Sequence, residues 1–375
     1  MAIDNKDKKI LNVPHLRFPE FSGEWEMVSL QDIATINPKS DPLQNTFIYI
    51  DLEAVEKGEL RKIQEIMREE APSRAQRVID NNDILFQCVR PYQKNNYIHR
   101  ILNTSNQQWV ASTGYAQIRT TELPNYIYHL LNTDEFNRKV MVRCTGSSYP
   151  AINSEDLATI HLYYTPDKKE QLKISRLLDL LDKRIATQNK IIEKLQSLIK
   201  GIAQNIVLLN KPNVCISQCL ECSSSTLQES DVLEYGTYPV YGANGIVGYL
   251  DNYNTQSEAI YIIKDGSGVG AVSYVTGKCS ATGTLNILQT KEGFSLQYLY
   301  YLLKVFNYEP YKTGMAIPHI YFKDYGKAKI FCPSYPEQLR YANLLSTIDC
   351  KLLAEQNILS NLSVQKQYLL RQMFI

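Results

Sequence analysis

Three cysteines near the middle of the chain have a spacing that could bind a metal cluster. Cys215, Cys219 and Cys222 form a C-x3-C-x2-C pattern, and three thiolates so spaced can hold an iron–sulfur cluster. The corresponding places in the first half of the chain, which repeats the second as shown below, carry no thiol. We therefore expect these cysteines to be small buried side chains of a strand and a helix.

A glycine-rich segment could bind a phosphate. Residues 265–270 read DGSGVG and follow an expected strand, which is the setting of a nucleotide-binding loop. Such a loop needs a G-x-G-x-x-G spacing and a following helix whose first N–H groups bind the phosphate. Here the spacing is G-x-G-x-G, and the next residues, AVSYVTG, are β-branched and turn-forming. The segment is better explained as a hairpin turn.

The histidines do not form a catalytic or zinc-binding pattern. No pair shows the H-x-x-x-H or H-E-x-x-H spacing that places two imidazoles on one metal. The histidines are His15, His99, His129, His161 and His319. The sequence therefore predicts a chain with no catalytic residues, no metal site and no cofactor of its own.

The charge balance limits the kinds of binding protein that the chain can be. Its 375 residues include 40 Lys and Arg against 39 Asp and Glu, which gives a net charge of +1. This excludes a globally basic nucleic-acid binder and an acidic tail, but it allows a local basic groove. No apolar run approaches the ~18 residues of a membrane span, and the first ten residues lack the apolar stretch of a signal peptide. We therefore expect a cytoplasmic protein whose eight cysteines are reduced.

Tyrosine is unusually frequent, with 26 Tyr beside only 2 Trp. Its ring is apolar and rigid and has a polar tip, which suits a binding surface. Half-buried β-strands are also rich in tyrosine. Both explanations stay open from the sequence alone.

The chain contains one long internal repeat. Residues 145–162, TGSSYPAINSEDLATIHL, align with residues 313–330, TGMAIPHIYFKDYGKAKI, at an offset of 168. Residues 170–185, EQLKISRLLDLLDKRI, align with residues 337–352, EQLRYANLLSTIDCKL, at an offset of 167. This period is nearly half the chain and far exceeds the 20–50 residues of a solenoid repeat, so it indicates duplication of a whole module.

Each half ends in a long stretch with an apolar residue every three or four positions. This spacing is typical of a coiled-coil seam, and about 38 residues of helix give a rod of roughly 57 Å. The alternative is that each helix packs on its own globular part, and two paired helices could run in either direction. Gln188, Glu355 and Lys366 are polar members of the seam. The apolar seam residues are Leu178, Leu181, Ile185, Ile192, Leu195, Ile199, Leu345, Ile348, Leu352, Leu359, Leu362 and Leu369.

The parts before the two long helices read as mixtures of strands and short helices. Short Tyr, Ile and Val runs between turn signals predict strands, for example at residues 47–50, 84–86, 260–263 and 271–275. Residues 123–132 and 295–304 predict short helices. The fold class is α+β, with two globular domains joined by two long helices in an internal duplication. The expected boundaries are 1–166 and 211–335 for the globular domains and 167–210 and 336–375 for the helices.

Several short motifs, in order along nearly the whole chain, carry a family resemblance. Each is weak alone, but their order, with the helical repeat, is specific. They are LRFPEF at residues 16–21 with Gly23 and Trp25, VSLQDI at residues 28–33, the helix from residue 170, YPVYGANG at residues 238–245, and Gly283-Thr284. In this order the chain resembles the specificity subunits of type I restriction–modification systems.

The resemblance implies a fold and a function. It implies two target-recognition domains, each reading one half of a bipartite double-stranded DNA site, and an antiparallel coiled coil that sets the gap. It implies that the coil docks two modification (methyltransferase) subunits and that restriction (endonuclease/translocase) subunits join them. It also implies that the chain has no catalytic role, so S-adenosylmethionine, ATP and Mg belong to the partner subunits.

Polar loops in the first half are the candidate DNA contacts. Reading of the major groove uses Arg or Lys for guanine and Asn or Gln for adenine, and phosphates are bound by cations and hydroxyls. Residues 87–97, QCVRPYQKNNY, follow a strand and are rich in such groups; a merely solvated hairpin is the alternative. The candidates in this half are Arg90, Gln93, Lys94, Asn95, Ser147, Ser148 and Tyr149.

The second half offers different loops, as expected if each half reads a different sequence. Glycines in two of them let the backbone approach DNA closely. The candidates are Tyr241, Asn244, Lys264, Ser267, Lys312 and His319. Two other functions stay open: a coiled-coil protein–protein scaffold without DNA specificity, and a recognition fragment of a fused enzyme. The target sequence, the gap and the methylated base cannot be read from the chain.

Overall fold

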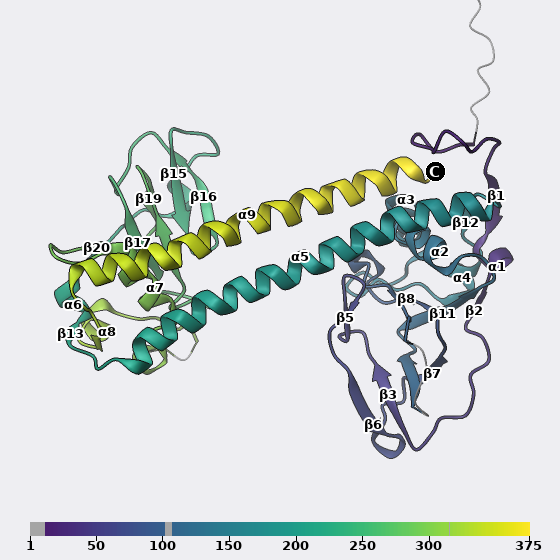
Figure 1. The fold of residues 1–375 in the computed structure, drawn as a ribbon, viewed down its shortest axis with the longest axis horizontal. Coiled ribbons are helices and arrows are strands. Elements are labelled where there is room, and N and C mark those ends of the chain that lie inside the picture. The colour runs from purple at the N-terminus through teal and green to yellow at the C-terminus, as the bar shows by residue number, and fades with distance from the viewer. Residues whose placement is uncertain (1–11, 102–106, 315) are drawn as a thin grey trace, which may run out of the picture. The chain divides into compact units, whose positions relative to one another are not determined.

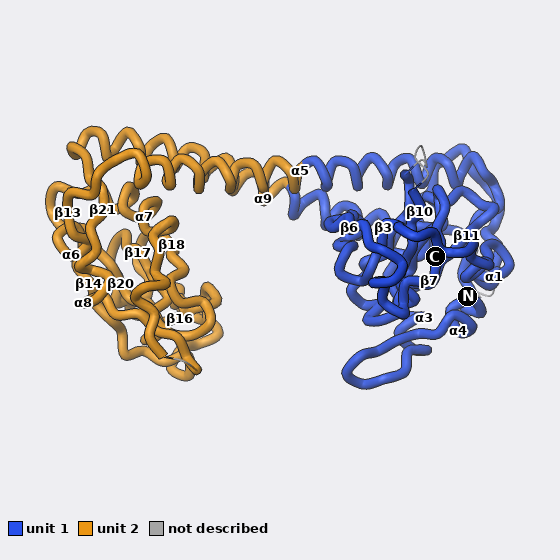
Figure 2. The backbone as a smooth tube through the Cα atoms, turned by 90° about the horizontal axis from the view of Figure 1, so that it is seen from below, with its two compact units in different colours: residues 1–187, 359–375 blue, residues 188–358 orange. Residues whose placement is uncertain are grey.

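The computed structural model of the protein describes residues 12–101, 107–314 and 316–375. The chain forms two compact units, the first from residues 1–187 with 359–375 and the second from residues 188–358 (Figure 2). Two long helices, α5 (Lys168–Leu209) and α9 (Tyr335–Met373), each contribute residues to both units. Within the described ranges, no helix is both long and apolar enough to cross a membrane.

The first unit is built on two four-stranded sheets and two short strand pairs. Its strands are β1 (Glu26–Ser29), β2 (Ala34–Ile36), β3 (Thr46–Ile50), β4 (Val55–Glu56), β5 (Glu59–Leu60), β6 (Gln64–Met67), β7 (Ala75–Ile79), β8 (Ile84–Gln87), β9 (Tyr97–Ile98), β10 (Gln108–Ser112), β11 (Tyr115–Thr120) and β12 (His161–Tyr164). One sheet has the order β6-β3-β10-β7, with β3 and β10 parallel. The other has the order β2-β11-β8-β9 and is antiparallel throughout, while β1 pairs with β12 and β4 with β5.

Short helices and the end of the chain complete the core of the first unit. The helices are α1 (Leu30–Ile33), α2 (Pro124–Leu131), α3 (Asp134–Arg143) and α4 (Ser154–Ala158). The Phe374 ring lies 6.0 Å from Trp25 and 5.5 Å from Tyr126, measured between ring centroids, and all three side chains are buried. The C-terminal end of α9 is thus part of the same apolar core as the beginning of the chain.

The second unit repeats this plan with fewer strands. Its elements are β13 (Val214–Cys215), α6 (Ile216–Cys219), β14 (Leu220–Ser224), β15 (Tyr238–Gly242), β16 (Gly245–Leu250), β17 (Ala259–Ile263), β18 (Val272–Val275), β19 (Ser280–Ala281), β20 (Leu285–Thr290), α7 (Leu296–Val305), α8 (Phe322–Tyr325) and β21 (Lys329–Ile330). The order β14-β20-β17-β18 corresponds to β2-β11-β8-β9, and the parallel pair β15-β19 corresponds to β3-β10. The duplication seen in the sequence is therefore a duplication of sheet topology.

The helices α5 and α9 pair side by side in each unit (Figure 1). In the first unit, Ile174 and Leu178 near the start of α5 share an apolar cluster with Leu370 and Met373 near the end of α9. The start of α5 therefore packs against the end of α9, which makes the pair antiparallel. Every predicted seam position, from residue 178 to 206 and from 345 to 373, is buried or half-buried in the structure.

The polar members of the seam find partners across it. In the second unit the Gln188 amide donates to the Glu355 carboxylate and to the Glu355 carbonyl oxygen, the latter at 3.0 Å. In the first unit the Lys366 ammonium lies 2.6 Å from an Asp182 carboxylate oxygen. A polar residue at a seam position selects a register, because any other register leaves it buried without a partner.

The main secondary-structure predictions are confirmed. Strands β3, β8, β17 and β18 and helices α2 and α7 occupy the predicted segments within one or two residues. The glycine-rich segment 265–270 is the turn between the antiparallel strands β17 and β18, as its sequence predicts. The long helices begin at Lys168 and Tyr335 and run for 42 and 39 residues.

Candidate functional site

The segment that follows β8 is a tight turn with both ends in the left-handed conformation. A short 3-10 turn, Pro91–Gln93, lies between Arg90 and Lys94, whose φ angles are 55° and 52°. This conformation costs free energy for any residue with a side chain. The turn is fastened by the buried Gln87 side chain, which donates to Gln93 at 2.9 Å and accepts from the Asn95 N–H at 3.1 Å.

The second candidate loop of the first unit lies against this turn. Val89 and Ala151 form an isolated β-bridge, and the Arg90 N–H donates to the Pro150 carbonyl oxygen at 2.7 Å. The Arg90 guanidinium carbon lies 4.4 Å from the centroid of the Tyr149 ring. The Tyr149 side chain is 63% exposed. The structure thus brings together two loops that are more than fifty residues apart in the sequence.

Some candidates in these two loops already have hydrogen-bond or ion-pair partners within the unit, and others do not. The Lys94 ammonium lies 2.7 Å from an Asp134 carboxylate oxygen, and the pairing lowers the pKa of Asp134. The Asn95 side-chain oxygen accepts from the Lys57 N–H at 3.0 Å. In the part of the chain that the structure describes, the side chains of Arg90, Ser147 and Ser148 make no hydrogen bond or ion pair.

In the second unit the loop that follows β17 is also held by backbone hydrogen bonds to a segment farther along the chain. Asp265 and His319 form an isolated β-bridge, and the Gly266 N–H donates to the Pro318 carbonyl oxygen at 2.9 Å. The Ile320 N–H donates to the Lys264 carbonyl oxygen at 2.9 Å. Lys264 and Ser267 are therefore on a loop that is joined to the segment carrying Lys312 and His319, as the two loops of the first unit are joined.

The two loop attachments match bond for bond. The bond from Arg90 to Pro150 corresponds to that from Gly266 to Pro318. The bond from the Ile152 N–H to the Cys88 carbonyl oxygen, 3.0 Å, corresponds to that from Ile320 to Lys264. Equivalent residues of the first loop differ by 176 in residue number between the two units, and those of the second loop differ by 168. Arg90 and Gly266 therefore occupy the same place, and both have positive φ, 55° and 96°.

The remaining candidates of the second unit are more constrained. The Lys312 ammonium lies 2.5 Å from a Glu309 carboxylate oxygen, and the His319 ring nitrogen Nδ1 lies 3.0 Å from the Ile317 carbonyl oxygen. The Tyr241 ring is half-buried against Tyr261, at 5.8 Å between centroids, and burial raises the pKa of Tyr241. Asn244 is exposed at the turn between β15 and β16.

One cationic cluster of the second unit was missed by the sequence reasoning. The Lys278 ammonium lies 4.9 Å from the Tyr253 ring centroid and 5.9 Å from that of Tyr238, and the two rings stack edge to face at 5.2 Å. A cation over aromatic rings is stabilised by their quadrupole. Tyr238 begins β15, and Tyr253 and Lys278 lie in two separate loops, so only the high tyrosine content could have suggested them.

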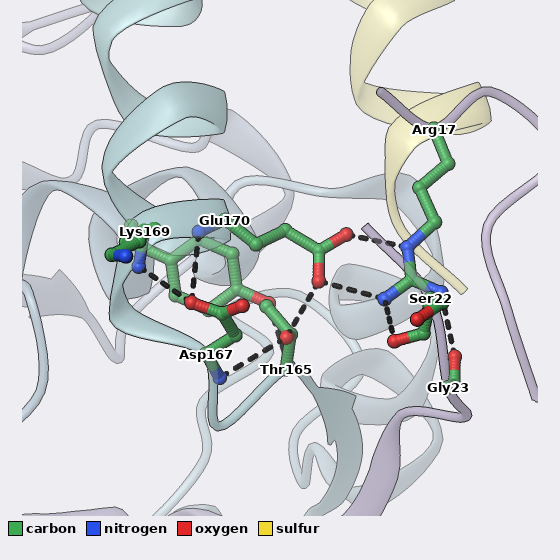
Figure 3. Close-up of polar contacts among 8 residues, drawn as sticks. Arg17, Ser22, Gly23, Thr165, Asp167, Lys169 and Glu170 are labelled. Carbon is green, nitrogen blue, oxygen red and sulfur yellow. Dashed lines mark hydrogen bonds and ion pairs between the residues drawn. The ribbon is translucent and has the colours of Figure 1, made fainter. Parts of the chain in front are cut away.

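A buried ion pair anchors the first of the long helices (Figure 3). The Arg17 guanidinium binds both carboxylate oxygens of Glu170, at 2.6 and 2.8 Å, and it also donates to the carbonyl oxygens of Ser22 and Gly23. The Thr165 hydroxyl donates to Glu170 at 2.7 Å. The hydrogen bond to Glu170 raises the pKa of Arg17. This contact ties the LRFPEF segment to the first turn of α5, which begins two residues before Glu170.

The three cysteines that suggested a metal cluster are not grouped around one point. Cys219 lies 3.9 Å, sulfur to sulfur, from Cys332 rather than from Cys215 or Cys222. The Cys222 thiol donates to the Ser223 carbonyl oxygen instead. Across the described ranges, no three His, Cys, Asp or Glu side chains are placed to hold a metal ion.

Comparison with known proteins gives one consistent result. A family model described as the type I restriction modification DNA specificity domain matches residues 22–197 and again residues 214–363. A protein of Mycoplasma genitalium named as a type I specificity subunit is 24% identical over 272 residues, which cover 66% of this chain and 70% of that protein. The specificity subunit of the Escherichia coli type I restriction enzyme EcoprrI is 27% identical over 112 residues, which cover 30% of this chain and 28% of that one.

Solved structures show the same fold. The crystal structure of a type I restriction–modification S subunit from M. genitalium superimposes with a TM-score of 0.66 at 17% identity, over 97% of this chain and 99% of that chain. A chain from a study of complex assembly in the type I restriction–modification system superimposes with a TM-score of 0.53 at 20% identity, over 92% and 96%. Both likenesses cover nearly the full length.

Proposed function

Because the chain belongs to the type I restriction–modification DNA specificity family and is the subunit that recognises the DNA sequence, we propose that each unit reads one half of a divided duplex target. The two matches of the family model each lie mostly in one of the two units, and each unit has its own sheets and loops. The first unit uses the loops that meet at Arg90 and Tyr149. The second uses the loops that meet at Gly266 and Pro318.

One observation carries this proposal: the same backbone attachment holds a differently sequenced loop in each unit. In both units the loop after β8 or β17 is hydrogen-bonded to the segment before α4 or α8. The attachment uses backbone atoms, so it imposes no side chain on the loop itself. The two units can therefore present different side chains to DNA on loops that are held in the same way. A bipartite target with two different halves requires this.

The partners that we propose are the other subunits of a type I complex. The chain would bind double-stranded DNA together with two modification (methyltransferase) subunits, with restriction subunits joining that core in the cytoplasm. S-adenosylmethionine, ATP and Mg would then be bound by those subunits. The chain itself contributes recognition and no catalytic step, and the length of α5 and α9 sets the number of base pairs between the half-sites.

The exposed side of α5 supports a docking role for this helix. Leu177 and Leu180 in the first unit and Ile191 and Leu198 in the second are exposed, with fractions from 36% to 65%. At 100° per residue, their separations of 3, 11 and 7 residues place all four on one face of the helix. Apolar side chains in such a row are buried when another helix packs on them. A helix of a modification subunit is the occupant that the family membership favours.

Methylation mapping in cells that carry the whole system tests the proposal. Long-read sequencing should reveal one modified motif with two specified parts and an unspecified gap. Replacement of residues 80–100 by the corresponding residues of another family member should then change one part and leave the other intact. If both parts change, or if the complex binds DNA without sequence preference, the two-reader proposal is wrong and a scaffold role would explain the chain better.

A further inference from the structure

The strained Arg90, stacked on Tyr149, is the feature that the proposed function leaves without a role of its own. Its φ of 55° places a residue with a long side chain where the second unit has Gly266, whose φ of 96° is typical of glycine. A glycine at position 90 would avoid the strain and keep the backbone bond to Pro150. Residues in strained conformations persist where the side chain is needed and the surroundings enforce the geometry.

The contact with Tyr149 holds the guanidinium without using its hydrogen-bond donors. The guanidinium carbon lies over the Tyr149 ring, 4.4 Å from the ring centroid. A cation in this position is attracted by the quadrupole of the ring, so the contact needs no hydrogen-bond acceptor for the N–H groups. Within the described residues these groups have no acceptor, although the side chain is half-buried. The guanidinium is therefore oriented before any ligand binds, and its donors remain unused.

Neighbouring cations do not share this property. The Lys94 ammonium is paired with Asp134 and also donates to the Asn132 carbonyl oxygen at 3.3 Å. The Lys139 ammonium donates to the His161 carbonyl oxygen at 3.1 Å and is paired with Glu135. Both lysines thus have roles within the unit, while the Arg90 side chain, at the junction of the two candidate loops, has no ion pair with any residue that the structure describes.

We propose that Arg90 is a specificity-determining residue that reads a guanine in the half-site of the first unit, with Tyr149 as the positioning residue that orients it. Two parallel N–H donors of an oriented guanidinium match the O6 and N7 acceptors that guanine presents in the major groove. The second unit has no side chain at the equivalent Gly266, so its half-site is read by other residues. This inference rests on the proposed function.

The test uses the complete complex and the variant Arg90→Gly. This variant removes the reader but fits the left-handed backbone, so it keeps the loop attachment and does not threaten folding. Preference for G·C at one position of one half-site should fall about 5- to 150-fold, as expected for loss of a bidentate contact. The other half-site should stay unchanged. Duplex panels with each base pair replaced in turn, at fixed salt, give this profile.

Two further variants identify the roles. Tyr149→Ala should weaken preference at the same base pair by a smaller factor, and Tyr149→Phe, which keeps the ring, should retain it. Asn82→Gly is the matched control, because Asn82 has φ 71° in the same unit and its substitution relieves the same kind of strain. It should leave both half-sites unchanged.

The outcomes separate this inference from the proposed function. If Arg90→Gly weakens binding to all duplexes equally, Arg90 contacts a phosphate and the inference is wrong. It is also wrong if Tyr149→Ala alters a different base pair. If the parent complex recognises no divided duplex site, the proposed function fails. If the parent reads such a site and Arg90→Gly reads the same one unchanged, only the guanine assignment fails.

Discussion

Removal of Arg17 should destabilise the first unit strongly, because it leaves a buried carboxylate without its cation. The Glu170 side chain is 0% exposed, and after Arg17→Ala the Thr165 hydroxyl at 2.7 Å is its remaining side-chain donor among the described residues. Breaking a buried ion pair from one side costs about 3–5 kcal/mol. For a unit of this size each kcal/mol lowers the melting temperature by about 2–4 °C, so we expect a loss of about 6–20 °C.

Differential scanning calorimetry of the full chain is the assay. The transition that shifts should be that of the first unit alone, since Arg17 and Glu170 both belong to it. The double variant Arg17→Ala, Glu170→Gln should recover much of the loss because it removes the buried charge.

A surface ion pair on the same segment provides the control. Glu20 is paired with Lys173 on α5, and both side chains are 46% exposed. Glu20→Gln should shift the transition far less than Arg17→Ala, since exposed pairs are screened by water and salt. A shift below 2 °C for Arg17→Ala would refute the reasoning, because it would mean that Glu170 is hydrated in the folded protein.

Other perturbations test separate parts of the two units. Burial lowers the pKa of His99 to about 4, so its contribution to stability is complete above the unfolded value near 6.5 and is lost as the pH falls from there toward 4. The loss is about 3 kcal/mol in total. The melting temperature of His99→Phe should therefore depend less on pH between 7 and 4.5 than the melting temperature of the parent protein. Mild oxidation with a disulfide reagent should join Cys219 and Cys332, which lie 3.9 Å apart; mass spectrometry should then show two hydrogens lost from the parent and none from Cys332→Ser. Gln188→Leu should lower the melting temperature of the second unit by leaving Glu355 without its amide donor, whereas Gln188→Leu with Glu355→Leu should raise it while weakening the preference for one register; equal melting temperatures for the two variants would contradict this.

The long helices could be predicted because their signal is local. An apolar residue every three or four positions reports one helix face without reference to the rest of the fold. The predicted seam positions are accordingly buried or half-buried, and the polar position Gln188 meets the polar position Glu355. The direction of pairing could not be read from that spacing, because parallel and antiparallel seams look alike in sequence.

The equivalence of Arg90 and Gly266 could not be predicted. The offset between the halves is 168 at the second loop but 176 at the first, so alignment by a constant offset pairs Arg90 with a residue in another place. The bonds that reveal the match join backbone atoms and leave no side-chain pattern. The stacking of Arg90 on Tyr149 also depends on two loops that only the folded sheets bring together.

The change of offset indicates how one fold can serve two different readings. Between the loop after β8 and the loop before α4 the first unit has eight more residues (176 − 168) than the second unit has between its matching loops, while both backbone attachments persist in each unit. An attachment through backbone bonds does not depend on the side chain, so Arg90 and Gly266 can differ without loss of loop position, although the positive φ costs free energy for Arg90. Strain is then present only where a side chain is retained: all the described residues other than glycine with positive φ lie in the first unit. Two of these five residues, Arg90 and Lys94, border the turn after β8, so in the first unit the strain falls in part on a candidate DNA loop, whereas the equivalent Gly266 of the second unit carries no such cost.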